Sequence, residues 1–381
     1  MAKVQTVDAC GYSIPALKSG TSLTVTTNTQ GYSGTVAASC SIAGALSVST
    51  TNACTKTGPT QAELAIQTSV PTPTYAVGSA QLEYFNYVNR QRAQCGLGLL
   101  SQNAALDAAA ANHAGYVVNR EKVASEMAAY AANPHYEING LSGFSGVSNS
   151  DRAKSAGYLG QTAGEVATFS WFPIADSISD AGAGMYTARG LVGSVYHMAT
   201  VMNTAREVGI GAVIGASRFA DSKFNSIVID HGVNGYEQDA RQFKQFPCQG
   251  SSDVPPEFTG EAPDPVSALG LKFPVGTPIW LQVPTVGPDM VVKSASVTPT
   301  TGGTTFSTAT GNLLVLTKDN DPNKRLGSGK AFLIPHQPLQ SDTAYAVTAV
   351  VSIDGVEHTR SFTFTTGKTW GSLVQNYLVK R

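Results

Sequence analysis

The middle of the chain concentrates side chains that could bind a metal ion or act as acids and bases. His135, Glu137, Glu165 and His197 all lie there, and Glu137 follows His135 by two residues. Two imidazoles and two carboxylates are donor types that zinc takes in sites with an open coordination position. His-x-Glu is also a common pair by chance, so the spacing leaves open a hydrogen-bonded polar cluster that only braces the loops.

Three further side chains belong to this inventory. Ser194 precedes His197 by three residues, so the two could touch on one helix face, but no Gly-x-Ser-x-Gly elbow surrounds Ser194 and a serine hydrolase is not favoured. His113 shares a predicted helix face with apolar residues, which indicates a buried, hydrogen-bonded histidine rather than a ligand. His231 follows a predicted strand, and its role stays open.

Composition excludes two classes of protein. Asp, Glu, Lys and Arg make up 13% of the 381 residues, with 25 basic against 26 acidic side chains and no basic run. Nucleic-acid binding needs a dense basic surface, so we expect no nucleic-acid partner. No stretch approaches the ~18 apolar residues of a membrane-spanning helix, so we expect no transmembrane segment.

The elements that would position these residues alternate between helices and a few strands. Ser79 can cap a helix that Gly96 ends, and a second, alanine-rich helix is predicted from about Asn103. A loop-rich region follows Pro134, and a later helix runs through Tyr196-His197-Met198. Residues 211–214 and 226–230 are predicted to form a strand pair. This order is typical of layered α+β packing.

The sequence predicts β-structure on both sides of this segment. Residues 1–74 alternate Val and Leu with Thr and Ser, which predicts a small β-module, the alternative being a disordered Ser/Thr-rich lead. Residues 249–264 are rich in proline and predict a linker. In residues 265–381, Asp354-Gly355 indicates a hairpin between two alternating runs, and Tyr345 could be a corner tyrosine. We expect an immunoglobulin-like β-sandwich that folds independently over residues 265 to 367.

Six short motifs in a fixed order carry a family resemblance over residues 78–248. They are Leu82-Glu83-Tyr84-Phe85-Asn86-Tyr87-Val88-Asn89-Arg90-Gln91-Arg92, Asn103-Ala104-Ala105-Leu106-Asp107-Ala108-Ala109-Ala110-Ala111-Asn112-His113-Ala114, Asp151-Arg152-Ala153-Lys154-Ser155-Ala156-Gly157-Tyr158, Gly164-Glu165, Ser194-Val195-Tyr196-His197 and Val208-Gly209-Ile210-Gly211. In this set the chain resembles bacterial members of the CAP superfamily, the group of cysteine-rich secretory proteins, antigen 5 and pathogenesis-related proteins.

The resemblance implies a secreted protein whose central domain is an α-β-α sandwich with two histidines and two glutamates in a cleft. His135, Glu165 and His197 match three of these four positions. The fourth position departs, because the family's Trp-x-x-Glu is replaced by Leu191-Val192-Gly193-Ser194. We expect Glu137 to supply the missing carboxylate, with Ser194 beside the site otherwise. Zinc or another divalent cation is the cofactor that this cluster would hold.

The cysteines indicate an oxidising compartment. Cys95 and Cys248 bracket the CAP-like segment, which holds no other cysteine, so we predict a disulfide between them. A second pair is predicted between Cys40 and Cys54, which leaves Cys10 either unpaired or bonded to a cysteine of another molecule. The first residues lack the apolar region of a signal peptide. We nevertheless expect a secreted or periplasmic protein whose signal peptide precedes the sequence given.

Two functional classes follow from these observations. The first is a secreted binding protein whose His/Glu cleft takes a lipid, a sterol or a divalent cation, while the β-modules present or tether it. Its partner would be a small apolar ligand or a component of a host or cell surface. The alternative is an extracellular metal-dependent hydrolase, similar to a protease, that uses the same cluster.

Overall fold

In the computed structural model the chain divides into two compact units, Met1–Ala65 and Ile66–Arg381. The structure describes residues 3–7, 9–58, 60, 65–174, 177–235, 243–283 and 289–379. Helices and strands both contribute substantially, as the α+β expectation requires.

The first unit is built of strands around a small core. Its five strands are β1 (Lys3–Val7), β2 (Cys10–Ile14), β3 (Ser22–Thr26), β4 (Tyr32–Cys40) and β5 (Leu46–Lys56). β1 and β2 form a hairpin, and β3, β4 and β5 form an antiparallel sheet. Tyr12, Ile14, Val36 and Ala38 are buried together between them.

The predicted Cys40–Cys54 disulfide is wrong. Cys54 is bonded to Cys10, and Cys40 is a free thiol. The register explains the difference, because Cys40 lies opposite Leu46 at the turn end of the β4–β5 hairpin. Cys54 lies near the open end, beside Thr55, which pairs with Ser33. There it faces the buried Cys10 of β2.

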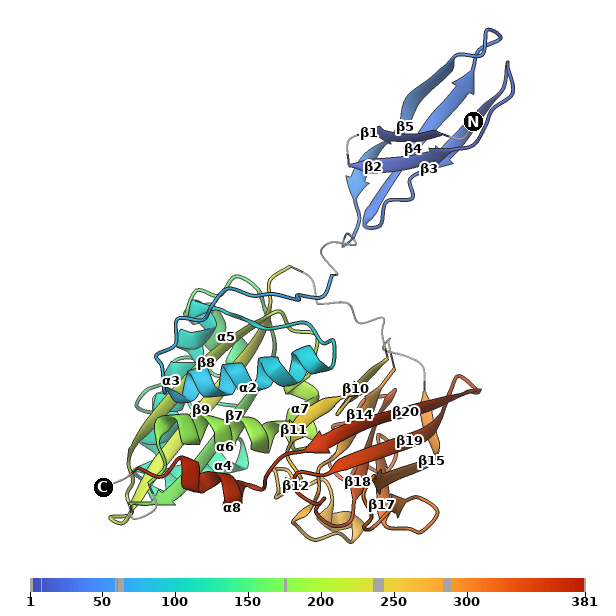
Figure 1. Cartoon of the computed structure of the whole chain (residues 1–381). Coiled ribbons are helices and arrows are strands. Elements are labelled where there is room, and N and C mark those ends of the chain that lie inside the picture. The colour runs from blue at the N-terminus through green and yellow to red at the C-terminus, as the bar shows by residue number, and fades with distance from the viewer. Residues whose placement is uncertain are drawn as a thin grey trace. The chain divides into compact units, whose positions relative to one another are not determined.

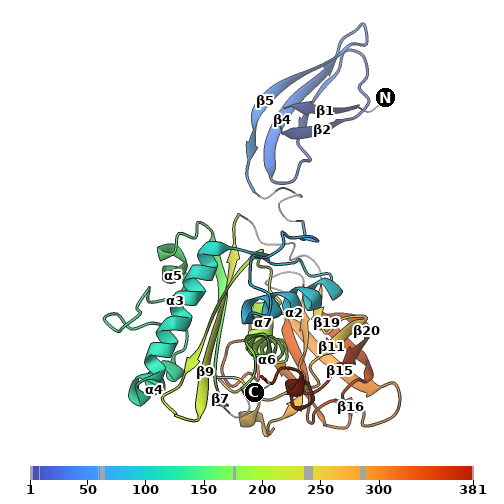
Figure 2. The ribbon, with the colours of Figure 1, turned by 60° about the vertical axis from the view of Figure 1, so that its left-hand side comes forward.

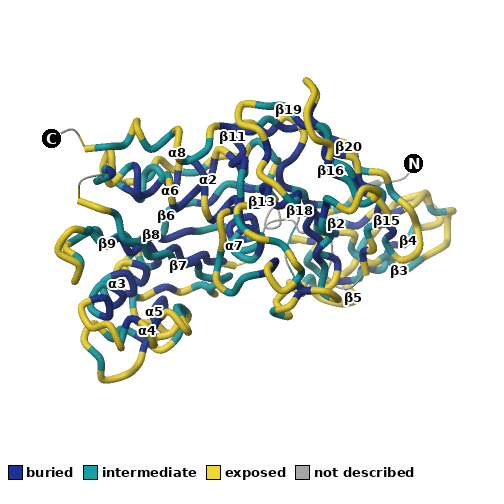
Figure 3. The backbone as a smooth tube through the Cα atoms, turned by 90° about the horizontal axis from the view of Figure 1, so that it is seen from below, coloured by how far each residue is buried: buried dark blue, intermediate teal, exposed yellow. Residues whose placement is uncertain are grey.

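The second unit contains a four-stranded sheet with helices on both faces (Figures 1 and 2). The strand order is β6-β8-β9-β7, where the bounds are β6 (Ser101–Gln102), β7 (Gln161–Pro173), β8 (Glu207–Ala216) and β9 (Ser222–Val233). One face is covered by α3 (Ala104–Glu121), α4 (Ala124–Ala132) and α5 (Asn149–Ser155). The other is covered by α2 (Ala80–Gln94), α6 (Asp180–Val192) and α7 (Tyr196–Val201). β7 and β8 run through the interior between these helices (Figure 3).

Local signals place the first helices where the sequence predicts them. Ser79 accepts a hydrogen bond from the Leu82 N–H at the start of α2, and Gly96 follows its end with φ +63°. Asn103 caps α3 through the N–H groups of Ala105 and Leu106. His113 is fully buried on α3 and hydrogen-bonded, as its helix face indicates.

The last part of the second unit consists of two sheets that enclose a core. One sheet is β10-β14-β18-β17, with bounds β10 (Lys244–Phe246), β14 (Ile279–Gln282), β17 (Leu313–Thr317) and β18 (Lys330–Pro335). The other is β11-β20-β19-β15-β16, with bounds β11 (Ser251–Val254), β15 (Met290–Pro299), β16 (Phe306–Ser307), β19 (Ala344–Ile353) and β20 (Val356–Thr366). A short pair joins β12 (Glu257–Phe258) to β13 (Val275–Gly276), and η2 (Ser267–Leu269) precedes β13.

Two local predictions in this part are confirmed. Asp354 and Gly355 form the turn between β19 and β20 with φ angles of +48° and +83°, which is the left-handed backbone of a two-residue hairpin loop. The Tyr345 hydroxyl accepts a hydrogen bond from the Gln340 N–H at 2.7 Å, as a corner tyrosine does.

The proline-rich segment 249–264 does not run free between two bodies. Its residues form β11, which pairs with β20, and β12, which pairs with β13. A single hydrophobic core continues from the α/β part into the two-sheet part and includes Val195, Phe246, Trp280 and Phe332. The chain then returns through α8 (Trp370–Leu373) and η3 (Val374–Asn376) to the α/β part, where Leu378 forms a bridge with Ile178.

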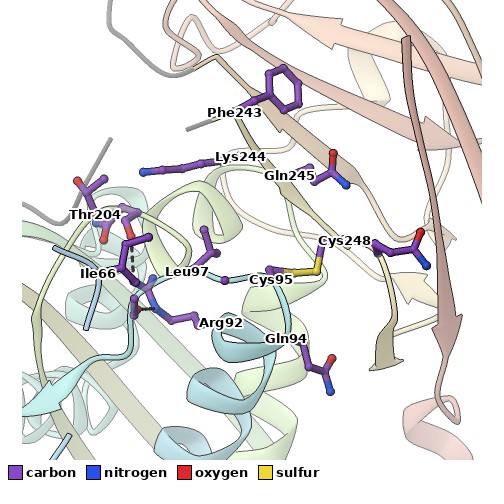
Figure 4. A pocket seen from close by; sticks show the side chains of 14 residues that line it. Ile66, Arg92, Gln94, Cys95, Leu97, Thr204, Phe243, Lys244, Gln245 and Cys248 are labelled. Atoms are coloured by element: carbon purple, nitrogen blue, oxygen red, sulfur yellow. Dashed lines mark hydrogen bonds between the residues drawn. A yellow bond between two sulfur atoms is a disulfide. The ribbon is translucent and has the colours of Figure 1, made fainter. Parts of the chain in front are cut away.

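The predicted Cys95–Cys248 disulfide is present and ties the end of α2 to the segment between β10 and β11 (Figure 4). Ser251 contacts both sulfur atoms through its hydroxyl. The bond therefore joins the α/β part to the two-sheet part of one unit. No helix among the described residues is long and apolar enough to cross a membrane.

Candidate functional site

A buried polar cluster lies between β7, β9 and the helices α3 and α5. Glu165 on β7 and Asp230 on β9 stand directly opposite each other in the antiparallel register. Glu165 accepts a hydrogen bond from His135 Nδ1 at 3.0 Å and is bonded to the Arg152 guanidinium. The side chains of Glu165 and Arg152 are 1% and 0% exposed, whereas His135 is 35% exposed. His135 is therefore the member that solvent can reach.

A second carboxylate–histidine pair extends the cluster inward. Glu137 lies 2.9 Å from His113 Nδ1, and its carboxylate accepts a hydrogen bond from the Ser145 N–H at 2.6 Å. His113 Nε2 lies 3.9 Å from Glu165, so the two pairs touch. Glu137, predicted as the fourth member of the site of His135, Glu165 and His197, thus pairs with His113.

The backbone of β7 aims Glu165 at this cluster. The register of β7 against β9 shifts between Thr162 and Gly164, and Gly164 has a φ of +140°. A Cβ atom at Gly164 would lie 2.8 Å from the methyl group of Thr200, so only glycine fits this close approach to α7. The Gly-Glu motif therefore has a steric reason as well as a chemical one.

The pKa values of the two facing carboxyl groups, Glu165 and Asp230, are shifted in opposite directions. Burial, together with the Glu165 charge, raises the pKa of Asp230 far above its usual range. Burial also raises the pKa of Glu165, but the His135 hydrogen bond and the charges of His113 and Arg152 outweigh it and hold that pKa below its usual range. Asp230 therefore keeps its proton and can donate it as a hydrogen bond to Glu165. No hydrogen-bond donor among the described residues reaches the Asp230 oxygens.

His231, next to Asp230, is not a ligand in this arrangement. Its ring is fully buried, and burial together with the Arg92 charge lowers its pKa to about 3, so it stays neutral. Asp230 and Arg152 belong to the cluster but were not among the candidate site residues predicted from the sequence. The signal for Asp230 was an acidic residue that directly follows the apolar run Ile227-Val228-Ile229 in a predicted strand.

Of the predicted metal ligands, His135 and Glu165 contact each other, and His197 contacts Glu261. Among the described residues, no three His, Cys, Asp or Glu side chains are arranged to hold a metal ion. Glu165 is already bonded to a permanent cation, Arg152, and Glu137 to His113. The donor set that is present thus does not fit a zinc site, because a metal would have to displace a buried guanidinium.

His197 and Ser194 line a separate feature, a pocket of about 490 Å³. Its walls come from β7, α6 and α7, from the segment 255–262 and from α8. Leu191, Pro255, Pro256 and Trp370 make much of it apolar. Concave sites with mainly apolar walls and a few polar groups are the usual form of small-molecule sites.

A carboxylate does pair with His197 in this pocket, and it comes from Glu261 rather than Glu137. His197 Nδ1 lies 2.7 Å from the Glu261 carboxylate, whose side chain is 1% exposed. The N–H groups of Val195 and Tyr196 also donate to Glu261, at 2.8 and 3.1 Å. Sequence reasoning missed Glu261 because it lies in the segment predicted to be a linker.

A smaller pocket of about 280 Å³ lies beside the Cys95–Cys248 disulfide (Figure 4). Arg92 is among its lining residues, but its guanidinium donates to the carbonyl oxygens of Gly98, Val201 and Asn203. These bonds fix the loops around α2, so Arg92 has a structural role there.

Comparison of the chain with protein-family models, with curated proteins and with solved structures finds no match.

Proposed function

We propose that this chain is a secreted binding protein that takes a small, mainly apolar molecule into the pocket between β7, α6, α7, the segment 255–262 and α8. The observation that carries the proposal is the pocket itself, about 490 Å³ in volume and walled by Leu191, Trp370 and two prolines. Such a volume suits a small lipid-like molecule, and the polar pair His197–Glu261 at its wall would orient one end.

The CAP resemblance supports the same class of function. Its expected helices lie on both faces of a short sheet, and His135 and Glu165 are in hydrogen-bond contact. The two disulfides fit a protein of an oxidising compartment. On this proposal the two β-modules present or tether the binding domain, with a host or cell-surface component as their partner.

The other candidate roles receive less support from the geometry. A cation at His135, Glu165 and His197 would need donors that Arg152 and Glu261 already occupy. A hydrolase would need an activated nucleophile, but the Ser194 hydroxyl donates to the Leu191 carbonyl oxygen at 2.8 Å. Binding of a small molecule in the pocket is therefore favoured over cation binding and over hydrolysis.

A substitution that fills the pocket tests the proposal. Gly190 lies on α6, lines the pocket, and has open space where a Cβ would be, so Gly190→Leu adds an apolar side chain without a clash. We expect it to weaken binding of the neutral apolar probe N-phenyl-1-naphthylamine about tenfold or more. We also expect equal or higher thermal stability, because leucine favours a helix by up to ~1 kcal/mol over glycine. Probe fluorescence and thermal unfolding measure the two effects.

Gly115→Leu is the matched control. Gly115 lies on α3, also has open space at its Cβ position, and does not line this pocket, so its variant should bind the probe like the wild type. Mass spectrometry of an organic extract of the purified wild-type chain should in addition identify a bound apolar molecule. Wild-type protein that takes up neither probe nor natural ligand, or equal binding by both glycine variants, would refute the proposal.

A further inference from the structure

The polar end of the pocket is fixed by a residue from outside the CAP-like segment. Glu261 follows β12, in the part of the chain that leads to the two sheets, and its carboxylate is buried against the start of α7. It accepts hydrogen bonds from the N–H groups of Val195, Tyr196 and His197. With these bonds the carboxylate is held in one position beside the His197 ring.

This position determines which nitrogen of His197 carries the proton. Nδ1 lies 2.7 Å from a Glu261 oxygen, and two lone pairs would repel each other at that distance, so Nδ1 must be protonated. In a neutral imidazole the proton on Nδ1 leaves Nε2 with a lone pair, as an acceptor. His197 lines the pocket, and Nε2 has no hydrogen-bond partner among the residues that the structure describes.

Four other polar side chains of the pocket wall are already engaged. The Ser194 hydroxyl donates to the Leu191 carbonyl oxygen. Thr168 and Thr187 hydroxyls lie 3.3 Å apart, and Arg189 is bonded to Asp253 and to the Lys368 carbonyl oxygen. Ser170, Tyr186, Glu257 and Thr259 also line the pocket, and Nε2 of His197 is the acceptor that the contact with Glu261 fixes there.

We infer that Glu261 is a specificity-determining positioning residue, which holds His197 as a hydrogen-bond acceptor so that the pocket selects apolar molecules carrying a hydroxyl group. This inference rests on the proposed ligand-binding function and names the chemistry of its ligand. A hydroxyl donates to Nε2, whereas the ketone of the same carbon skeleton cannot and leaves Nε2 unpaired in an apolar pocket. An unpaired buried acceptor reduces affinity about tenfold.

The pair 2-decanol and 2-decanone tests this selection with the full chain. The dissociation constant of each compound is measured by its displacement of N-phenyl-1-naphthylamine at about pH 8.5, where an ordinary imidazole is neutral. We expect the wild type to bind the alcohol about tenfold more tightly than the ketone. In Glu261→Gln, the amide N–H can donate to Nδ1, which moves the ring proton to Nε2. Nε2–H then donates to alcohol and ketone alike, so the ratio of their dissociation constants should fall to about one.

Two control variants separate this effect from general damage. Glu357→Gln makes the same chemical change on the exposed surface of β20 and should keep the wild-type ratio. His197→Leu removes the acceptor, so this variant should still bind the probe but lose the preference for the alcohol over the ketone. It replaces Glu261→Gln as the test variant if Glu261→Gln does not fold.

Nitrogen-15 NMR of the His197 ring gives a readout that needs no ligand. We expect the Nδ1–H form in the wild type and the Nε2–H form in Glu261→Gln. An Nε2–H signal in the wild type would overturn the inference whatever binds. Probe binding with no preference for the alcohol would overturn the inference and leave the proposed function standing. Failure of the probe to bind would refute the proposed function itself, and the ring signals would still decide the role of Glu261.

Discussion

At the scale of single residues, His135 and His197 have carboxylate partners of different origin. His135 is held by Glu165 on β7, and His197 by Glu261 from a distant segment. Glu165 in turn is balanced by Arg152 and by the protonated carboxyl of Asp230. Each histidine therefore has an oriented ring, and buried negative charge is compensated without a metal ion.

The Glu165–Asp230 pair makes a pH-dependent contribution to stability. Because the pKa of Asp230 is raised in the folded chain, the folded state holds one more proton than the unfolded state above about pH 4. The stability contributed by Asp230 is complete below that pH and is lost as pH rises towards the folded pKa. Asp230→Asn mimics the protonated form and should gain on the wild type by up to roughly 1.4 kcal/mol per pH unit.

Urea unfolding of both proteins at several pH values from about 5 to 8 measures this difference. Glu165 and Glu137 are present in both proteins, and their lowered pKa values affect both alike at the acid end. A difference in unfolding free energy that stays constant with pH would show that Asp230 is ionised in the folded chain.

At the scale of elements, close packing of α3 on β8 sets the position of the cluster. Ala110 and Ala114 on α3 are fully buried, and Gly209 and Gly211 on β8 lie beneath the helix backbone. A Cβ atom at Gly211 would lie 2.2 Å from the Ala110 carbonyl carbon, so the helix and strand meet with no room for a side chain. This approach holds His113 of α3 near Glu165 of β7.

Gly211→Ala should therefore destabilise the second unit. The added methyl group must push α3 away from the sheet, which costs about 1–3 kcal/mol. Gly215→Ala is the matched change, because Gly215 lies on the same strand with open space at its Cβ position. We expect Gly215→Ala to shift the free energy of unfolding by less than about 0.5 kcal/mol. Equal effects of both changes in urea unfolding would contradict the packing argument.

At the scale of the whole molecule, the α/β part and the two sheets share one core and one disulfide. Phe246, Trp280 and Phe332 from the two-sheet part are fully buried in the same core as Val192 and Val195. β10 and β11, which begin before residue 265, are edge strands of the two sheets. The boundary that the sequence suggests therefore removes strands from both sheets.

The fragment 265–367 should consequently fail to fold cooperatively by itself. Without the α/β part it would expose the buried aromatic side chains, and without β10 and β11 it would leave two sheet edges unpaired. Residues 66–381 should instead unfold in one cooperative thermal transition. Circular dichroism of both fragments measures this, and a cooperative β-type transition of 265–367 would restore the independent domain that the sequence predicts.

The sequence by itself determined the elements whose signals are local. Ser79 and Asn103 cap their helices through residues two or three positions away, and Asp354-Gly355 closes a hairpin between adjacent strands. The Cys95–Cys248 bond was also accessible, because these are the only cysteines of residues 78–248. In each case the deciding residues are near one another in sequence or are limited in number.

Only the tertiary structure decided which distant side chains meet. The strand register places Asp230 opposite Glu165 and carries Cys54 away from Cys40 to Cys10. The fold of segment 249–264 onto both parts brings Glu261 to His197, across 64 residues. No local pattern encodes these meetings, because they depend on how whole elements pack to bury apolar surface.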